Sequence, residues 1–315
     1  MLKVGKSWPE LRSPRSGVRR RLDNLKSSLQ NNQVWRPTDD HHFVFLCGAN
    51  RTQNCGISAR RAAITEFAAR FLPNTKIFLA EKVFETLLPE GDKLNLLDTE
   101  RSLTNFADTI LIVLESGSAF CELGAFSIDI TLRKKIVVVN DSQYEDVTSF
   151  INLGPLAAIR SANKEFILSY KMSSQGVETI DGIGDIFPKL YKILYRETLK
   201  KRSRVTIDDC RPNSLLSKDA FRFLHDIVYF TQPITHSEII QILIHIFGEG
   251  TYDDVKRLLG LLRAVNELEV HQINSIPHYV TAAIKPYFDY DHLDKTSIIA
   301  AFRSRHLRVD AARLI

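Results

Sequence analysis

Short apolar runs alternate with segments of helical spacing over residues 43 to 168. Four runs of four to six residues are suited to buried parallel strands, and Phe166–Leu168 could be a fifth. The four runs are Phe43–Cys47, Lys76–Leu79, Thr109–Leu114 and Ile136–Asn140. Apolar residues between them recur at helical intervals over Ile57–Leu72, Val83–Leu88, Leu94–Phe106 and Ala119–Leu132.

This alternation predicts an α/β fold, a flavodoxin-like or Rossmann-like parallel sheet covered by helices on both faces. We expect the strand order 2-1-3-4-5, in which the first and third strands flank the switch point. The carboxyl ends of these strands open onto a crevice where ligands bind in such folds. The turn at 47–50 and the segment Glu115–Glu122 should therefore form opposite lips of one pocket.

The pattern changes after the sheet. Ile183–Lys201 predicts one long helix. Three further helices are expected over Leu215–Phe230, Ser237–Phe247 and Tyr252–Asn266. The second should begin near Thr235 or His236 and end at Gly248, and Thr251 should cap the third. Two short alternating segments, Glu269–Ile273 and Tyr279–Ala282, follow them and suggest a small hairpin. Three helices and a hairpin predict a winged helix, with a plain helical interaction module as the alternative.

Four parts follow from these boundaries. Residues 1–40 form a basic arm with one short helix near Leu22–Leu29, and 41–182 form the α/β domain. Residues 183–204 form a basic linking helix, and 205–315 form the winged-helix domain. No signal-peptide core and no membrane-length apolar run is present in the sequence, so we expect a cytoplasmic protein without membrane contact.

Composition excludes several classes of site. The four cysteines are expected to be free thiols, since none forms a C-x-x-C pair, and the nine histidines show no zinc-hydrolase spacing. The turn after the first strand has neither G-x-G-x-x-G nor G-K-[ST], which disfavours a dehydrogenase or P-loop enzyme. We therefore expect no metal and no bound cofactor.

Glu122 is the principal candidate for chemistry. It follows the third strand at the predicted switch point, in a helix that Ser118 can cap after the tight turn at Gly117. A carboxylate there can attack an anomeric carbon and form a covalent intermediate. The alternative is a first-turn acid that complements the helix dipole. A Cys121 nucleophile is disfavoured, because the nearest histidines precede the first strand.

Other residues of the crevice could bind a substrate. Gly48, Ala49 and Asn50 could cradle a phosphate with the start of the next helix, where Arg60 and Arg61 could pair with it. Glu115 could hold ribose hydroxyls, and Ser118 is a further candidate for substrate binding. Asp108 precedes its strand, so a structural role is favoured for it over ribose binding.

The net charge is +5, and basic residues gather in two blocks, the first within 12–26 and the second within 189–204. In the second block, Lys192, Arg196 and Lys200 recur every four residues and would share one face of the linking helix. That face is either a solvated surface or a surface that contacts nucleic-acid phosphates, and the second reading implies salt-sensitive binding.

The stretch from Ser118 to Phe126, with Glu122 and Gly124, resembles the nucleoside deoxyribosyltransferase family. That family has a G-[ST]-x-x-E-x-G-x-A turn whose Glu is the nucleophile. Here Gly117-Ser118 lies one residue early, and Glu115 is the nearest equivalent of the family's Asp before the turn. A closer resemblance is to effectors encoded beside bacterial retrons, carried by FLCGAN at 45–50, FADTILIVLESGSAFCELGAFS at 106–127 and SFINLGP at 149–155.

The retron resemblance implies a deoxyribosyltransferase-like catalytic domain joined to a winged helix. It implies an antiviral toxin that cleaves N-glycosidic bonds of NAD or related nucleotides, as hydrolase or transferase. The implied partners are a reverse transcriptase and its RNA-linked single-stranded DNA, and self-assembly is left open. A non-catalytic nucleotide sensor with a DNA-binding domain, or a simple winged-helix transcription regulator, remains the alternative.

Overall fold

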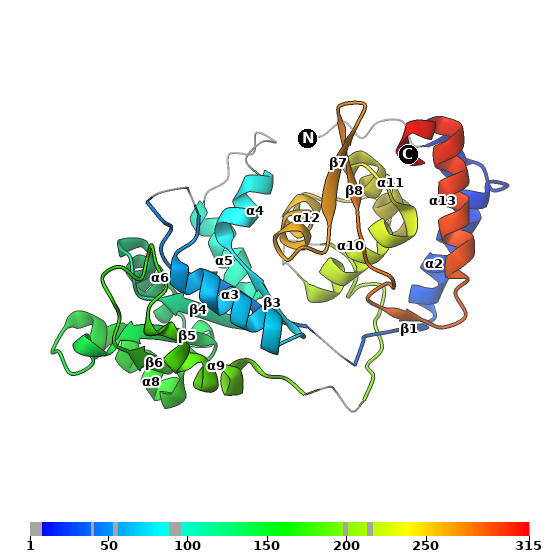
Figure 1. Cartoon of the computed structure of the whole chain (residues 1–315). Coiled ribbons are helices and arrows are strands. Elements are labelled where there is room, and N and C mark those ends of the chain that lie inside the picture. The colour runs from blue at the N-terminus through cyan, green and yellow to red at the C-terminus, as the bar shows by residue number, and fades with distance from the viewer. Residues whose placement is uncertain are drawn as a thin grey trace. The chain divides into compact units, whose positions relative to one another are not determined.

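The computed structural model describes residues 8–38, 41–52, 56–87, 96–197, 201–212 and 217–314. They divide into two compact units. The first contains the described residues of Asp39–Glu81 and Lys93–Thr198, and the second contains those of Met1–Thr38, Lys82–Asp92 and Leu199–Ile315. Each unit is described by itself (Figure 1).

A five-stranded parallel sheet forms the centre of the first unit. Its strands lie in the order β3-β2-β4-β5-β6, which is 2-1-3-4-5 along this part of the chain and confirms the predicted topology. The strands are β2 (His42–Cys47), β3 (Thr75–Phe78), β4 (Thr109–Val113), β5 (Ile136–Asp141) and β6 (Ile167–Tyr170). Every residue of the three central strands is buried, as expected for a sheet covered on both faces.

Helices cover both faces of this sheet. They are α3 (Ala59–Phe71), α5 (Leu96–Phe106), α6 (Gly117–Ser127), α7 (Ile130–Arg133), α8 (Ala157–Ala162) and α9 (Phe187–Leu194). A further helix, α4 (Ala80–Leu87), begins in this unit and continues into the other. Ile64 of α3 and Leu190 of α9 pack in one apolar cluster with Val113, which defines one face. On the other face Phe45 stacks on Phe78 at 5.3 Å between ring centroids and meets Phe126 of α6 at 6.5 Å.

Two predicted helices of this unit differ from the structure. The helix expected over Ala119–Leu132 is interrupted, because Asp129 accepts hydrogen bonds from the backbone of Thr131 and Leu132 and begins a new helix, α7. The helix expected over Ile183–Lys201 starts as a 3₁₀ turn at Gly182–Ile186 and ends, as α9, at Leu194. Leu194 is its last buried apolar residue, and the described residues that follow it, 195–197, are exposed and provide no buried apolar face that would sustain a helix.

The second unit contains the three predicted helices and the hairpin. They are α10 (Lys218–Thr231), α11 (His236–Phe247), α12 (Asp254–Ala264), β7 (Glu269–Ile273) and β8 (Ile276–Val280). Thr235 caps α11 in a reciprocal capping box with Glu238, and Gly248 ends it at φ 85°. Thr251 was expected to cap α12, but Asp253 holds the N-cap position and its side chain accepts no capping hydrogen bond. Residues 213–216, where the first helix was expected to begin, lie outside the described part, and the winged-helix assignment stays a prediction.

Residues 8–38 belong to this second unit. Here α1 (Pro9–Arg12) precedes α2 (Gly17–Gln30), which is longer than the short helix expected within it. Helix α2 contacts α13 (Lys295–Val309), and β1 (Val34–Trp35) pairs with β9 (Asp289–Tyr290). The N-terminal segment is thus packed against the C-terminal part. No described helix has the length and apolar character that a bilayer crossing requires.

Candidate active site

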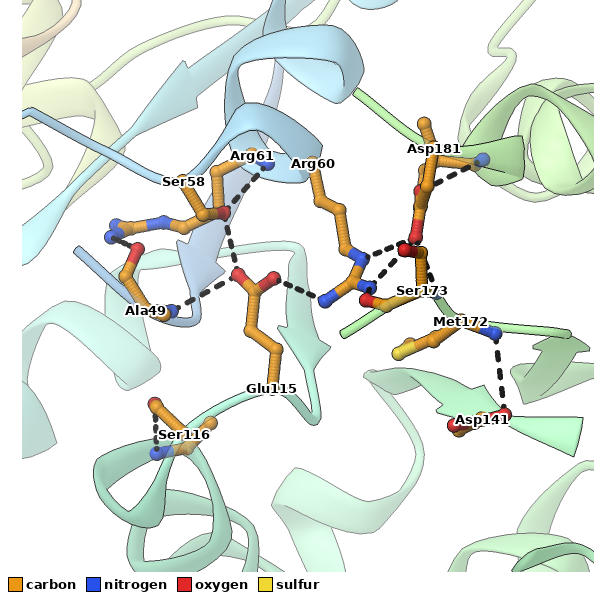
Figure 2. A network of polar contacts seen from close by, with 12 residues as sticks. Ala49, Ser58, Arg60, Arg61, Glu115, Ser116, Asp141, Met172, Ser173 and Asp181 are labelled. Carbon is orange, nitrogen blue, oxygen red and sulfur yellow. Dashed lines mark hydrogen bonds and ion pairs between the residues drawn. The ribbon is translucent and has the colours of Figure 1, made fainter. Parts of the chain in front are cut away.

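Glu115 joins the two strand ends that form the predicted crevice. It lies two residues after the end of β4 (Val113), and its Oε1 accepts hydrogen bonds from the backbone N–H of Ala49, at 3.1 Å, and from the hydroxyl of Ser58, at 2.5 Å. Ala49 follows β2 and Ser58 caps α3. The carboxyl edges of β2 and β4 therefore meet at this carboxylate, as Figure 2 shows.

The helix that carries Glu122 begins immediately afterwards. Ser116, and not the predicted Ser118, is the N-cap of α6, because its hydroxyl accepts the backbone N–H of Ala119 at 3.3 Å. Ser118 lies inside the first turn and its hydroxyl is 2.9 Å from that of Ser116. With Gly117 as the first helical residue, Glu122 lies in the second turn, and the first turn carries no acid. The dipole explanation for Glu122 is therefore weak, since that effect fades beyond the first turn.

The carboxyl group of Glu122 lies in an unusual environment. Its Oε2 is buried and finds no hydrogen-bond partner within the described residues. Burial raises the pKa of Glu122 to about 7, repulsion from Glu100 adds to this rise, and the opposing attraction of Arg61 is weaker. The thiol of Cys47, the last residue of β2, has a pKa raised first by burial and then by the negative charge of Glu122. A carboxyl group whose pKa lies close to neutral pH is the feature expected of an acid, base or nucleophile.

Arg61 supplies the positive charge next to Glu122. It is buried, and its Nη1 and Nη2 donate to both carboxylate oxygens of Glu81 at 2.8 and 3.1 Å. The same nitrogens reach the carbonyl oxygen of Leu46 and the side chain of Asn50, both at 3.0 Å. Burial raises the pKa of Glu81, but the hydrogen bond and charge of Arg61 outweigh it and hold that pKa below its usual value. Arg61 and Asn50 are thus bonded to each other beside Glu122, and their contact with a substrate stays a prediction.

Gly48 is required by close packing. A Cβ atom at this position would lie 2.9 Å from Cδ of Arg61 and 2.9 Å from Oε1 of Glu115. The neighbouring N–H of Ala49, which was expected to face a phosphate, donates to Glu115. The side chain of Glu115 has no exposed surface, so in this structure it binds the protein and no ribose can reach it. Its predicted ribose contact would require this arrangement to open.

Two other predicted candidates, Asp108 and Cys121, do not take part in the contacts around Glu122 described above. Asp108 accepts the backbone N–H of Phe43 at 2.9 Å and returns a backbone bond to the carbonyl of Phe43 at 2.8 Å. This pairing ties the amino ends of β2 and β4, the edge opposite to Glu122, and it supports the structural reading. His42 bonds Thr109 at that same edge, at 2.9 Å, while Cys121 is an exposed residue of α6. No group of described residues combines three side chains suited to a metal ion.

Comparison with known proteins assigns the family. Residues 56–270 match the model of the STM3845 retron effector protein family. The chain is also 37% identical over 314 residues, covering 97% of both proteins, to the Escherichia coli protein named "Retron Ec73 putative ribosyltransferase/DNA-binding protein". The chain belongs to the retron effector family. A second Escherichia coli protein, named "Retron Ec86 putative ribosyltransferase/DNA-binding protein", is 28% identical over 83% of this chain and 85% of its own length.

The predicted basic face is not continuous in this family member. Lys192 is exposed in the last turn of α9, whereas Arg196 follows the helix and donates to the carbonyl oxygens of Ile193 and Tyr195. Lys200 lies outside the described residues. The expectation that all three share one helix face is wrong for Arg196, because the helix ends at Leu194.

Four polar residues near the site were not identified from the sequence. Glu81 and Glu100 come from α4 and α5, and both influence the pKa of Glu122. Tyr170 and Asp181 bond Arg60, although Asp181 is 121 positions away from it in the chain. No spacing motif links them, so only the packing of the sheet reveals their proximity.

Proposed function

We propose that this retron effector cleaves N-glycosidic bonds of NAD or related nucleotides, with Glu122 as nucleophile. The observation that carries the proposal is the buried Oε2 of Glu122, which has no hydrogen-bond partner among the residues that the structure describes. An unpaired carboxylate oxygen costs stability, and such a cost is common where a group is kept available for a ligand. The names of the two Escherichia coli relatives, which include ribosyltransferase, support the same class of chemistry.

In the proposed reaction a carboxylate oxygen of Glu122 attacks C1′ of the ribose. The bond from C1′ to the base nitrogen breaks, and the base leaves with the bonding electron pair. Water then cleaves the glycosyl ester, giving the free sugar hydroxyl, the regenerated carboxylate and one proton. The nicotinamide of NAD leaves as a neutral molecule, so this step needs no general acid. The charge that develops on the sugar resembles that in retaining glycosidases.

Incubation of the purified chain with NAD and a panel of nucleosides and nucleotides tests this proposal. Mass spectrometry should detect a free base with wild type, and Glu122→Gln should lower the rate by several powers of ten. Glu66→Gln, an exposed acid on α3, is the matched control and should retain full activity. Near-normal turnover by folded Glu122→Gln would exclude the nucleophile. Tight nucleotide binding without any product would favour the sensor function instead.

We further propose that the second unit contains a winged helix that holds the effector in a complex with the retron reverse transcriptase and its RNA-linked DNA. Both relatives carry DNA-binding in their names, and the order of three helices and a hairpin fits such a module. The basic residues in the last turn of α9 and after it would contribute phosphate contacts. Because each neutralised phosphate releases counterions, binding should weaken steeply with salt.

Charge reversal tests the basic residues. Changing the three predicted positions to Glu should weaken binding to the purified retron complex and reduce its salt dependence. These positions are Lys192, Arg196 and Lys200. The matched control reverses three exposed lysines elsewhere in the first unit, namely Lys134, Lys164 and Lys171. Equal salt slopes for both triple variants and wild type would show that the basic residues are solvated surface.

A further inference from the structure

A buried network of three charged side chains runs from Asp181 through Arg60 to Glu115 (Figure 2). The guanidinium of Arg60 uses separate nitrogens for the two acids: Nη1 donates to Glu115 at 3.0 Å, and Nη2 donates to Asp181 at 2.7 Å. The side chains of Arg60, Glu115 and Asp181 are 3%, 0% and 6% exposed. Two carboxylates and one guanidinium are thus taken out of water together, which is favourable only with many precise hydrogen bonds.

Neutral donors satisfy the remaining negative charge. Glu115 accepts from Ala49 and Ser58, as described above, and Asp181 accepts from the hydroxyl of Tyr170 at 2.9 Å and from the backbone N–H of Ser173 at 3.0 Å. These donors come from the ends of β2 and β6, the start of α3 and the segment before α9. The network therefore ties together four parts of the sheet's carboxyl edge.

Tight packing fixes the position of Arg60. A Cβ at Gly176 would lie 2.2 Å from its Nη2 and 2.5 Å from Oδ2 of Asp181. The carbonyl oxygen of Ser173 accepts from the same nitrogen at 2.6 Å. Glycine at 176 lets the backbone close over the guanidinium, which leaves it no space for another orientation.

We propose that Arg60 and Glu115 are positioning residues that hold Glu122 in its reactive place. Glu115 is joined directly to Ser116, the cap of α6, and Glu122 follows in the second turn of that helix. The network anchors the β4–α6 turn to the β2–α3 turn, and so it fixes the start of the helix relative to Cys47 and Arg61. An error of about 1 Å in such a position can lower a rate about a hundredfold. The inference rests on the proposed function of Glu122.

Arg60→Lys is the sharpest test. It retains the positive charge but replaces the two fixed guanidinium nitrogens that hold Glu115 and Asp181 with a single ammonium nitrogen. We expect a folded protein in which kcat for base release falls at least about tenfold while KM changes less than about twofold. The matched control is Arg36→Lys, since Arg36 also bridges two acids, Asp209 at 3.3 Å and Asp219 at 2.8 Å, in the other unit. It should leave kcat unchanged.

Hydrogen exchange gives a second readout that does not depend on activity. In Arg60→Lys the amides of Ala49 and Ala119 should exchange faster, while those of Ile110 to Ile112 in β4 stay as protected as in wild type. Unchanged exchange and a kcat within twofold of wild type would overturn the inference, and so would a raised KM at constant kcat, which marks a substrate ligand. If wild type releases no base from any substrate, the proposed function fails, and the exchange result alone decides whether the network fixes the turn.

Discussion

Replacing Glu122 by Gln should stabilise the protein at alkaline pH. The folded-state pKa of Glu122 is about 7, against an ordinary value of 4.5. At about 1.4 kcal/mol per pH unit, keeping this carboxylate ionised inside the fold costs about 3 kcal/mol at pH 8. Because the folded pKa is raised, stability is lost as pH rises from about 4.5 to about 7. At pH 5 the cost falls to about 1 kcal/mol or less, and a neutral Gln avoids it throughout.

The assay must follow the α/β unit separately. Both tryptophans, Trp8 and Trp35, lie in the other unit, so tryptophan fluorescence follows that unit while far-ultraviolet circular dichroism follows both. Urea titrations are recorded at pH 5, 6.5 and 8. A transition that is seen by circular dichroism but not by tryptophan fluorescence is assigned to unfolding of the α/β unit. The stability of Glu122→Gln relative to wild type should increase by about 2.5 kcal/mol between pH 5 and pH 8.

The difference between pH values is the decisive quantity, because the unpaired Gln amide adds a cost that does not depend on pH. Glu66→Gln on the exposed side of α3 should show no comparable change. A constant difference between Glu122→Gln and wild type at all three pH values would refute the raised pKa. An increase that follows the expected course would show that the fold sacrifices stability to keep this carboxyl buried.

Two further outcomes follow from the site. If Glu122 acts as the nucleophile, kcat/KM for base release should rise about tenfold per pH unit below about 7 and level off above it, since the group must be ionised. A decline of kcat/KM above pH 7 would instead assign Glu122 as a general acid. Gly176→Ala, whose Cβ would lie 2.2 Å from the buried guanidinium of Arg60, should lower the urea midpoint of the sheet unit and reduce turnover. Gly184→Ala, with no atom within 4 Å of the added Cβ, serves as its control, and equal midpoints for both variants would contradict the packing argument.

The strand order and the proximity of the residues that follow β2 and β4 were predictable from the sequence. Buried parallel strands must be apolar on both sides, so runs such as Thr109–Leu114 are visible without any alignment. Right-handed crossovers and the switch-point rule then place the residues after β2 and β4 side by side. For the same reason Glu122 could be singled out as an acid in the helix that follows β4. The resemblance to retron effectors, read from three short stretches, agreed with the family found by comparison.

The pKa values, orientations and bonding partners of the side chains were decided by the tertiary structure. The pKa of Glu122 depends on burial and on Glu100, and the orientation of Arg60 depends on Asp181, 121 positions along the chain. Local pattern cannot report such distances, because they arise only when the sheet brings separate turns to one edge. The end of α9 shows the same limit. The sequence predicted one helix over Ile183–Lys201, but helices in proteins persist where an apolar face is packed, and the last buried residue of α9 is Leu194.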